Sequence, residues 1–153
     1  DMGEVKSPET YLGFERAENF ISPGGAKANQ AAHYSTPNTV ALNHWGLDGQ
    51  WTIGAERASL AAANGKIVYR FHARDLHLVL GPGSDGKPVR FKVMIDGQTP
   101  GASHGSDVAP DGSGTVTEQR LYQLVRQSGD VADHTFTIEF SDPGVSAYAF
   151  TFG

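Results

Sequence analysis

The sequence contains no cysteine. A chain of 153 residues without thiols has no disulfide, no thiolate nucleophile and no cysteine-ligated zinc. It also lacks an apolar run approaching the roughly 20 residues that a transmembrane helix needs. We therefore expect no membrane span and no signal peptide within this chain, and expect any export signal or anchor to lie outside it.

Basic residues are also few, with 12 Lys and Arg against 17 Asp and Glu. The net charge is −5 and no basic cluster is present, so a phosphate backbone would gain little from counterion release. We therefore expect no nucleic-acid partner. Apolar residues make up 39% of the chain, which is enough for a hydrophobic core, and the length corresponds to one domain.

Turn-forming residues are abundant, with 19 glycines and 8 prolines. Together they exceed the usual share of about 12%, which favours many turns over long helices. Residues 1–43 show little periodicity and are expected to form loops and short edge strands. We assign residues 1–7 to a flexible N-terminal remnant and residues 8–153 to a single domain. Because its last strand runs to the final residue, we expect this domain to close a longer protein.

From residue 50 onward, apolar residues recur at every second position, the pattern of strands with one buried face. The clearest strand is 89–95, which ends at Asp96-Gly97, a turn pair that tolerates positive φ. We predict an all-β jelly-roll sandwich with no long helix, in which the last two strands form a hairpin. The predicted strands are 51–53, 58–60, 67–73, 76–80, 89–95, 115–117, 121–125, 136–140 and 145–152.

The segment Gly101-Ala102-Ser103-His104-Gly105 matches the G-x-S-x-G pattern of a hydrolase nucleophile elbow. Such an elbow needs a strand before the serine and a helix after it. Here the following residues are turn formers that lead to another strand, so the sequence favours a glycine-rich loop. A hydrolase that uses Ser103 is the most distant of three hypotheses for this chain.

None of the six histidines shows a metal-binding spacing. His72 and His77 come closest, because they lie on the polar faces of two neighbouring strands that could pair. Asp107 and Asp111-Gly112 resemble a calcium loop, although without EF-hand spacing. We expect no cofactor, and leave open a structural cation such as calcium held by loop carbonyls and one or two carboxylates.

Aromatic and polar residues occur together in the remaining candidate segments. Sugars stack on aromatic faces, while Arg, Asn, Gln and Asp side chains bind their hydroxyl groups. Asn43, His44 and Trp45 lie in a less regular segment, and we predict that they form an exposed binding platform, because loops carry most binding residues. The other predicted ligand-binding residues are Tyr11, Arg74, His104, Arg120 and Tyr122.

Arginines share one face of the strand around 120–127 with apolar residues. Alternation places Arg120, Tyr122, Leu124 and Arg126 together on that face. A concave, partly hydrated sheet face would explain the mixture. Arginines whose aliphatic stems cover apolar surface would also explain it, and this second interpretation is slightly favoured.

Five segments resemble the C-terminal module of DipZ-type proteins: PETYLG at 8–13, FHARDLHLVL at 71–80, GASHGSD at 101–107, RLYQL at 120–124 and AYAFTFG at 147–153. Members of that family join a CcdA-like membrane domain, or a shorter export and anchor segment, to a thioredoxin-like domain and then to this module. The resemblance implies a jelly-roll fold similar to carbohydrate-binding modules. It also implies parent proteins that act in thiol–disulfide exchange and cytochrome c maturation outside the cytoplasm.

The present chain lacks the thioredoxin-like domain and every cysteine, so redox activity does not transfer to it. The leading hypothesis is a non-catalytic module that binds a glycan, such as a cell-wall polysaccharide. We expect an extracytoplasmic location, in the periplasm or cell envelope, with tethering through the parent protein. The alternative is a protein-interaction module that positions the covalently linked thioredoxin-like domain on its substrate.

Overall fold

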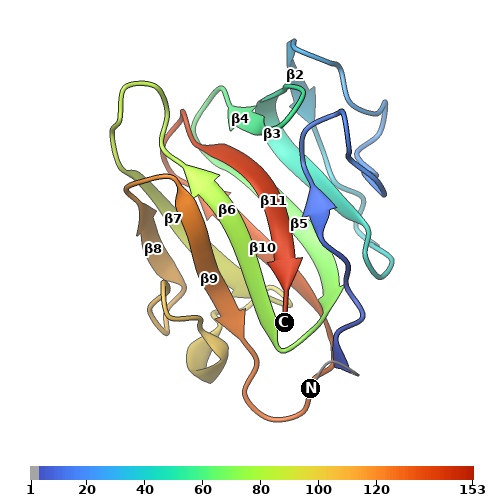
Figure 1. Ribbon diagram of the computed structural model, residues 1–153, viewed down its shortest axis with the longest axis vertical. Helices are drawn as coiled ribbons and strands as arrows, with labels where there is room; N and C mark the ends of the chain where they lie inside the picture. The colour runs from blue at the N-terminus through green and yellow to red at the C-terminus, as the bar shows by residue number, and fades with distance from the viewer. Residues whose placement is uncertain (1–3) are drawn as a thin grey trace.

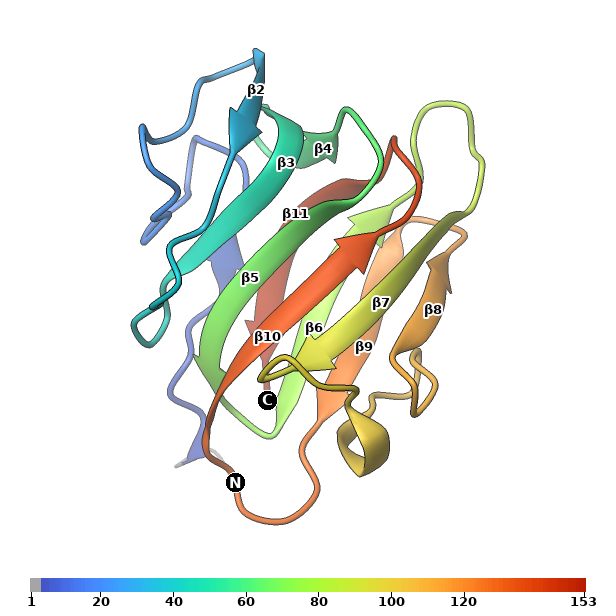
Figure 2. The same ribbon diagram turned by 180° about the vertical axis from the view of Figure 1, so that it is seen from behind.

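Alternating apolar residues build two antiparallel sheets that face each other across one core (Figures 1 and 2). The computed structural model describes residues 4–153, and no α-helix is present among them. A short 3-10 turn, η2, spans Gly101–Ser103. The strands are β1 (Thr10–Tyr11), β2 (Ala31–Tyr34), β3 (Trp45–Ile53), β4 (Ala58–Leu60), β5 (Gly65–His72), β6 (Asp75–Gly81), β7 (Val89–Ile95), β8 (Ser113–Val116), β9 (Arg120–Arg126), β10 (Asp133–Phe140) and β11 (Ser146–Phe152).

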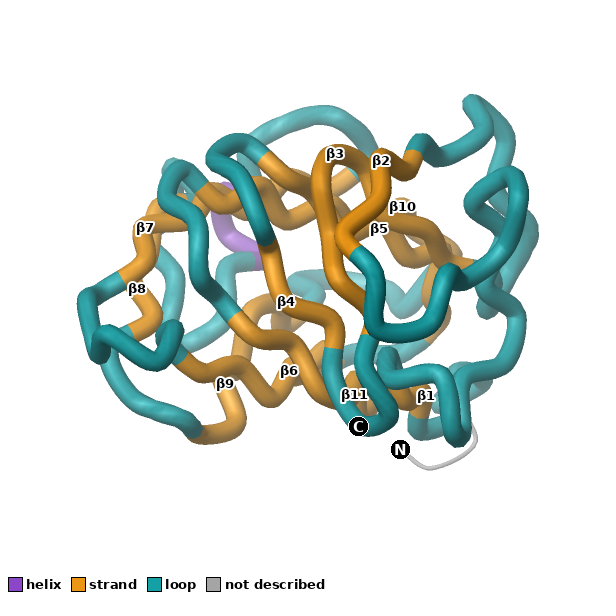
Figure 3. Tube along the Cα trace, turned by 90° about the horizontal axis from the view of Figure 1, so that it is seen from above, coloured by secondary structure: helices purple, strands orange, loops and turns teal. Residues whose placement is uncertain are grey.

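The first sheet has the strand order β4-β11-β6-β9, with the short β1 beside β11. The second sheet has the order β8-β7-β10-β5-β3. Strand β3 belongs to both layers, because its first half pairs with β5 and its second half pairs with β2 and β4. The two sheets are therefore joined along one side, as the view from above shows (Figure 3).

The inner faces of the two sheets meet in a core rich in aromatic rings. Strand β5 alternates buried and half-buried residues along its whole length, as period-two patterning predicts. Phe150 of β11 reaches across the core to Tyr69 of β5 and to Phe136 of β10, with ring centroids 4.8 and 6.0 Å apart. Tilted and edge-to-face rings at these distances stabilise the sandwich beyond simple burial.

The strand predictions are largely confirmed. Strand β7 has the predicted bounds, and Asp96 and Gly97 follow it with φ values of 52° and 79°, the positive values that the turn requires. The all-β class and the absence of a long helix in residues 4–153 are confirmed, whereas jelly-roll connectivity stays a prediction. Strand β3 is longer than expected. Glycines and polar residues between Trp45 and Trp51 interrupt the apolar alternation that would predict its first half.

The predicted hairpin between the last two strands is wrong. Strand β10 pairs with β5 and β7 in the second sheet, whereas β11 pairs with β1, β4 and β6 in the first. The turn between them therefore carries the chain across the sandwich. Arg90 fixes this turn, because its Nε and Nη2 donate to the carboxylate of Asp142 at 3.1 and 2.8 Å.

The start of the domain also differs from the expected boundary. Positions 1–3 of the predicted flexible remnant lie outside the described residues. Lys6 N donates to His72 O at 2.9 Å, and the buried Ser7 accepts from His72 N at 2.8 Å. Ser7 also donates to Asn43 at 2.6 Å. Residues 6 and 7 are therefore held in place as part of the domain.

Candidate ligand-binding site

The outer face of the first sheet carries a row of aromatic and apolar side chains that crosses four strands. Tyr11 of β1 lies opposite Ala149 of β11, Ala149 opposite Val79 of β6, and Val79 opposite Leu121 of β9. We call these four residues the cross-strand stripe. With neighbouring strands about 4.8 Å apart, the stripe is about 14 Å long. Leu121 is 46% exposed, so its side chain lies open to solvent at the β9 end.

A row of polar residues runs parallel to the stripe on the side nearer the chain termini (Figure 1). Here Thr151 of β11 lies opposite His77 of β6, and His77 lies opposite Gln123 of β9. All three are partly exposed on the same face. Each lies two residues along its strand from a residue of the stripe, so hydroxyl, imidazole and amide groups lie beside the apolar row.

Tyr148 adds polar groups on the other side of the stripe. The register of β11 against β6 shifts between Ala147 and Ala149, so Tyr148 is the additional residue of a β-bulge. Bulges redirect side chains at binding sites. The Tyr148 hydroxyl accepts a hydrogen bond from Arg57 at 3.3 Å and donates one to Gln119 at 3.1 Å. The stripe is thus flanked by hydrogen-bonding groups on both sides.

A pocket of about 260 Å³ lies over Ala149, between Tyr11 and Tyr148. Two loops wall it: Phe14 N donates to Gly54 O at 2.9 Å, and Glu15 N donates to Ala55 O at 3.1 Å. The loops meet at Gly13, where a Cβ atom would lie 2.3 Å from the Ala55 carbonyl oxygen, so any side chain would separate them. The pocket is lined by Tyr11, Glu15, Arg16, Ala55, Glu56, Tyr148 and Ala149.

Tyr11 is held in place by two charged neighbours. The Arg16 guanidinium lies 3.8 Å from the centroid of its ring, a cation–π distance. The Tyr11 hydroxyl donates to Glu9 Oε1 at 2.6 Å, and this bond is the main cause that raises the pKa of Tyr11 above its ordinary value. Tyr11 is therefore a neutral hydrogen-bond donor at neutral pH.

The glycine-rich segment 101–107 covers the free edge of β9. Gly105 N donates to Leu124 O and Asp107 N donates to Gln123 O, both at 3.1 Å. The His104 ring Nδ1 donates to the carbonyl oxygens of Val108, at 2.6 Å, and Gly105, at 2.9 Å. An unpaired strand edge invites pairing with other chains, and this segment occupies it.

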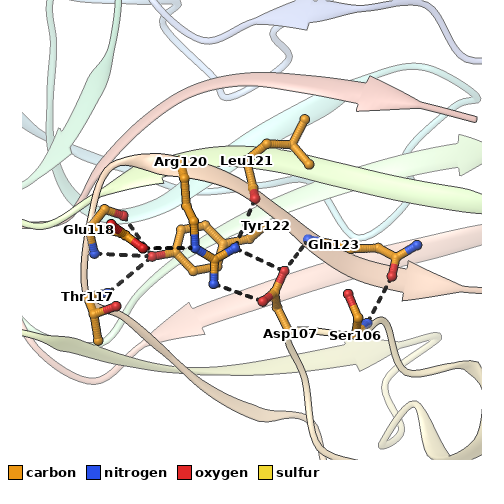
Figure 4. A network of polar contacts seen from close by, with 8 residues as sticks. All are labelled: Ser106, Asp107, Thr117, Glu118, Arg120, Leu121, Tyr122 and Gln123. Atoms are coloured by element: carbon orange, nitrogen blue, oxygen red, sulfur yellow. Dashed lines mark hydrogen bonds and ion pairs between the residues drawn. The ribbon is translucent and has the colours of Figure 1, made fainter.

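Arg120 and Asp107 complete this edge (Figure 4). Arg120 donates to both oxygens of Asp107 at 2.9 and 3.2 Å, and its guanidinium lies 3.8 Å from the centroid of the buried Tyr122 ring. The Asp107 bond raises the pKa of Arg120, and the Arg120 bond is the main cause that lowers the pKa of Asp107. Arg120 therefore covers the Tyr122 ring with its guanidinium, whereas coverage of apolar surface by its aliphatic stem stays a prediction.

The lowered pKa of Asp107 predicts a specific acid sensitivity. Because the folded state favours the carboxylate, its contribution is complete above the ordinary Asp pKa of 3.8 and is lost as the pH falls through the lower folded-state pKa. Asp107→Asn should reduce the free energy of unfolding at pH 7 by about 1 kcal/mol. Urea unfolding from pH 7 to pH 2 should show this difference shrinking below about pH 4. A difference that stays constant with pH would contradict the assignment.

The predicted platform around Trp45 is wrong. Trp45 is 0% exposed, its ring packs against Phe20 at 4.8 Å, and its Nε1 donates to Glu18 O at 2.8 Å. The reason is that 45–48 continue β3, whose inner side chains enter the core. His44 is partly exposed beside it, without a side-chain hydrogen bond among the described residues.

Two further candidates hold loops together rather than lining a pocket. Asn43 donates to Lys6 O at 2.9 Å and takes a φ of 65°, which asparagine tolerates. Arg74 donates to the carbonyl oxygens of Gln127 and Gly129 at 2.7 and 3.2 Å. Of the eight predicted binding residues, Tyr11 is the one that lies on the cross-strand stripe, and the buried Tyr122 is inaccessible to a ligand.

The nucleophile-elbow hypothesis is wrong. Ser103 ends the 3-10 turn and is followed by a series of turns and then by β8, not by a helix. Its hydroxyl lies 3.2 Å from the Ser128 hydroxyl and accepts from Ser128 N at 3.1 Å. The neighbouring His104 is bonded to backbone carbonyls instead, so within residues 4–153 the hydroxyl of Ser103 has no hydrogen bond to a histidine or carboxylate that could act as its base.

The metal-site candidates do not converge. Strands β5 and β6 lie in different sheets, so His72 contacts Asp133 at 2.6 Å while His77 lies on the stripe-bearing face. Asp107 is occupied by Arg120, and Asp111 accepts from Ser113 N and Oγ. Across residues 4–153, no three His, Cys, Asp or Glu side chains gather as a metal site.

Comparison with known families identifies the domain. A family model for the thioredoxin-like C-terminal domain matches residues 7–153. The chain belongs to this family. Two curated relatives, both called Protein DipZ, come from Mycobacterium bovis and Mycobacterium tuberculosis, and each is 29% identical over 93 residues. The match covers 57% of this chain but only 13% of each relative.

This thioredoxin-like C-terminal domain is of the DipZ type, which confirms the resemblance seen in the sequence. Despite the family name, the described residues form a β-sandwich, and the chain has no cysteine. No helix in the described part of the chain is long and apolar enough to cross a membrane.

Sequence reasoning missed most of the stripe in this thioredoxin-like C-terminal domain. Alternation along 120–127 leaves Leu121 and Gln123 on the face opposite Arg120 and Tyr122, but nothing in the pattern singled out Val79 or Ala149. Tyr148 offered a usable signal, since a large aromatic residue between two alanines in an apolar strand marks a change of face. The bulge that exposes it depends on pairing with β6, which is not a local property of the sequence.

Proposed function

We propose that this domain is a non-catalytic carbohydrate-binding module, and that the glycan lies along the cross-strand stripe. The main support for this proposal is the strand register, which aligns four residues on one outer face: Tyr11, Ala149, Val79 and Leu121. A sugar ring presents C–H groups on its faces and hydroxyl groups at its rim. An apolar floor between two rows of hydrogen-bonding groups matches that distribution.

The charges around the pocket suit a polar ligand without a strong charge of its own. Arg16 and Arg57 carry positive charge, and Glu15 and Glu56 carry negative charge. None of these four forms an ion pair within the described residues, so each can bind a hydroxyl group. A cell-wall polysaccharide is the ligand class that we favour.

Tyr11→Ala tests the proposal. In titrations with soluble manno-, xylo-, cello- and N-acetylglucosamine oligosaccharides, the variant should bind at least about tenfold more weakly than the wild type, equivalent to 1.4 kcal/mol. Binding should be measured by calorimetry and by NMR chemical shifts. Tryptophan fluorescence is less suitable, because Trp45 and Trp51 are 0% exposed and their emission would respond little.

Lys92→Ala is the matched control, since Lys92 is exposed on the outer face of the second sheet. It should bind as the wild type does. An unchanged affinity in Tyr11→Ala, or a loss in Lys92→Ala, would place the ligand elsewhere. If the wild type binds none of these oligosaccharides, the proposal of glycan binding is wrong.

The second candidate function is a protein-interaction module that positions a linked redox domain on its substrate. The cross-strand stripe favours it, because an apolar patch that continues across strands to the 46% exposed Leu121 suits a protein contact. In either case we propose a DipZ-type parent that is tethered to the membrane, lies outside the cytoplasm and carries a thioredoxin-like domain for thiol–disulfide exchange and cytochrome c maturation. A purified thioredoxin-like domain from such a parent should shift the Leu121 resonances only under this second candidate.

A further inference from the structure

The two rows on the outer face of the first sheet both lead into a second pocket at β1. Tyr11 is the last residue of the cross-strand stripe. Thr10 lies opposite Phe150, so the preceding Glu9 lies at the level of Thr151 and extends the polar row across β1. Tyr11 and Glu9 both line a pocket of about 340 Å³. A ligand that follows the two rows past β11 therefore reaches this pocket next.

This second pocket, which we call the β1 pocket, lies on the far side of β1 from β11. Besides Tyr11 and Glu9, it is lined by Pro8, Thr10, Arg16, Glu18 and Asn19, and none of these residues belongs to β11, β6 or β9. Tyr11 and Arg16 also line the pocket between Tyr11 and Tyr148. Both pockets are half-open to solvent, so a chain that lies over the Tyr11–Arg16 pair reaches both.

The two walls of the β1 pocket are anchored to the core. On one side, Trp45 Nε1 donates to Glu18 O at 2.8 Å and Trp45 N donates to Asn19 O at 3.1 Å. On the other side, the Thr10 hydroxyl lies 2.8 Å from the Tyr69 hydroxyl inside the sandwich. Walls that are already held in place lower the entropic cost of binding a ligand between them.

Polar groups in the β1 pocket are free to bind sugar hydroxyls. The Glu18 and Asn19 side chains are exposed, and neither makes a hydrogen bond or ion pair within residues 4–153. The Arg16 guanidinium has no ion pair within those residues either, and it lies at the junction of the two pockets. Hydrogen bonds between such charged groups and hydroxyls are roughly twice as strong as neutral ones.

From this arrangement we propose that the β1 pocket is a further sugar subsite, and that a glycan on the stripe continues over Tyr11 into it. At the opposite end, Leu121 is 46% exposed, and the covering segment 105–107 is bonded to Gln123 and Leu124 instead. The glycan is therefore free to extend at both ends. The inference rests on the proposed carbohydrate binding and narrows its ligand class to internal segments of a linear polysaccharide.

A double variant, Glu18→Ala with Asn19→Gly, tests the subsite. It removes both side chains but keeps the carbonyl oxygens that Trp45 bonds, and glycine readily adopts the φ of 62° found at position 19. With the best-binding hexasaccharide of the panel, calorimetry should show at least about tenfold weaker binding, equivalent to 1.4 kcal/mol. Unchanged hexasaccharide affinity, with Tyr11→Ala still weakened, would overturn the subsite and leave the proposed glycan binding intact.

Glu139→Ala is the matched control, since Glu139 lies opposite Lys66 and Lys92 on the outer face of the second sheet. It should bind the hexasaccharide as the wild type does. The double variant should keep the wild-type NMR fingerprint outside residues 8–19, because both substituted side chains are exposed. An equal loss of affinity in Glu139→Ala would contradict the assignment of the subsite.

Stoichiometry tests whether the interior of a chain is recognised. When soluble polysaccharides of the best-binding series and of known length are titrated, the number of domains bound per chain at saturation should rise with chain length. A single bound domain per chain at every length would overturn recognition of internal segments, although glycan binding would stand. If no saccharide binds, the proposed function itself is wrong.

Discussion

Trp45→Ala should lower the free energy of unfolding by about 3–5 kcal/mol, because it removes a large buried side chain and leaves a cavity. The ring is 0% exposed, packs on Phe20 and donates to Glu18 O. Urea unfolding followed by far-UV circular dichroism measures the change, since tryptophan emission is altered by the substitution itself. The variant should show no selective loss of saccharide affinity while it remains folded.

Two controls make this result specific. Trp45→Phe keeps much of the apolar surface and should cost less than Trp45→Ala, with about 1 kcal/mol attributable to the lost Nε1 hydrogen bond. Leu42→Ala changes an apolar residue that is 37% exposed in the neighbouring loop and should alter stability by no more than about 0.5 kcal/mol. If Trp45→Ala has near-normal stability but binds saccharides more weakly, the result would support the prediction that Trp45 forms an exposed binding platform.

Gly105→Ala should lower the free energy of unfolding by about 1–3 kcal/mol or more, the cost of forcing atoms into a packed site. A Cβ atom at position 105 would lie 2.3 Å from Gln123 O, which is backbone and cannot rotate away. The covering segment must therefore move off β9, and Arg120 would lose the fixed position of Asp107. The consequence is an exposed strand edge as well as a less stable domain.

Amide hydrogen exchange localises this effect. The Gly105 and Asp107 amides donate to β9 and should exchange faster in Gly105→Ala, whereas the amides that join β5 to β10 should change only with global stability. Ser106→Ala is the matched control, because the Ser106 side chain is exposed and its backbone makes the bond to Gln123. Equal destabilisation by both variants would show that the close approach at Gly105 is not the cause.

The fold class follows from local pattern to a large extent. Strand β7 was predicted with its observed bounds, and the turn at Asp96-Gly97 with its positive φ, because both depend on alternation and on residues that tolerate that backbone conformation. The partners of each strand do not follow in this way. Strands β10 and β11 both send alternate apolar side chains into one core, and alternation is the same whether two strands pair or face each other across it.

The site shows the same division. Tyr11 could be predicted from a single segment, whereas the outward direction of Leu121 could not, because neither face of 120–127 is wholly apolar. Trp45 was misplaced because the glycine-rich start of β3 resembles a loop. Ser103 lies in a G-x-S-x-G sequence without the structure that the motif requires. A nucleophile elbow is defined by the strand before the serine and the helix after it, as well as by the residue pattern.

The amino-acid sequence by itself determined an all-β chain without thiol chemistry, with inner and outer residues assigned strand by strand. Those properties depend on composition and on the period of two along an extended backbone. Only the tertiary structure decided that Tyr11, Ala149, Val79 and Leu121 form one row, that a bulge exposes Tyr148, and that two loops wall a pocket beside the row. These features arise from register between strands distant in the chain, which local patterns do not encode.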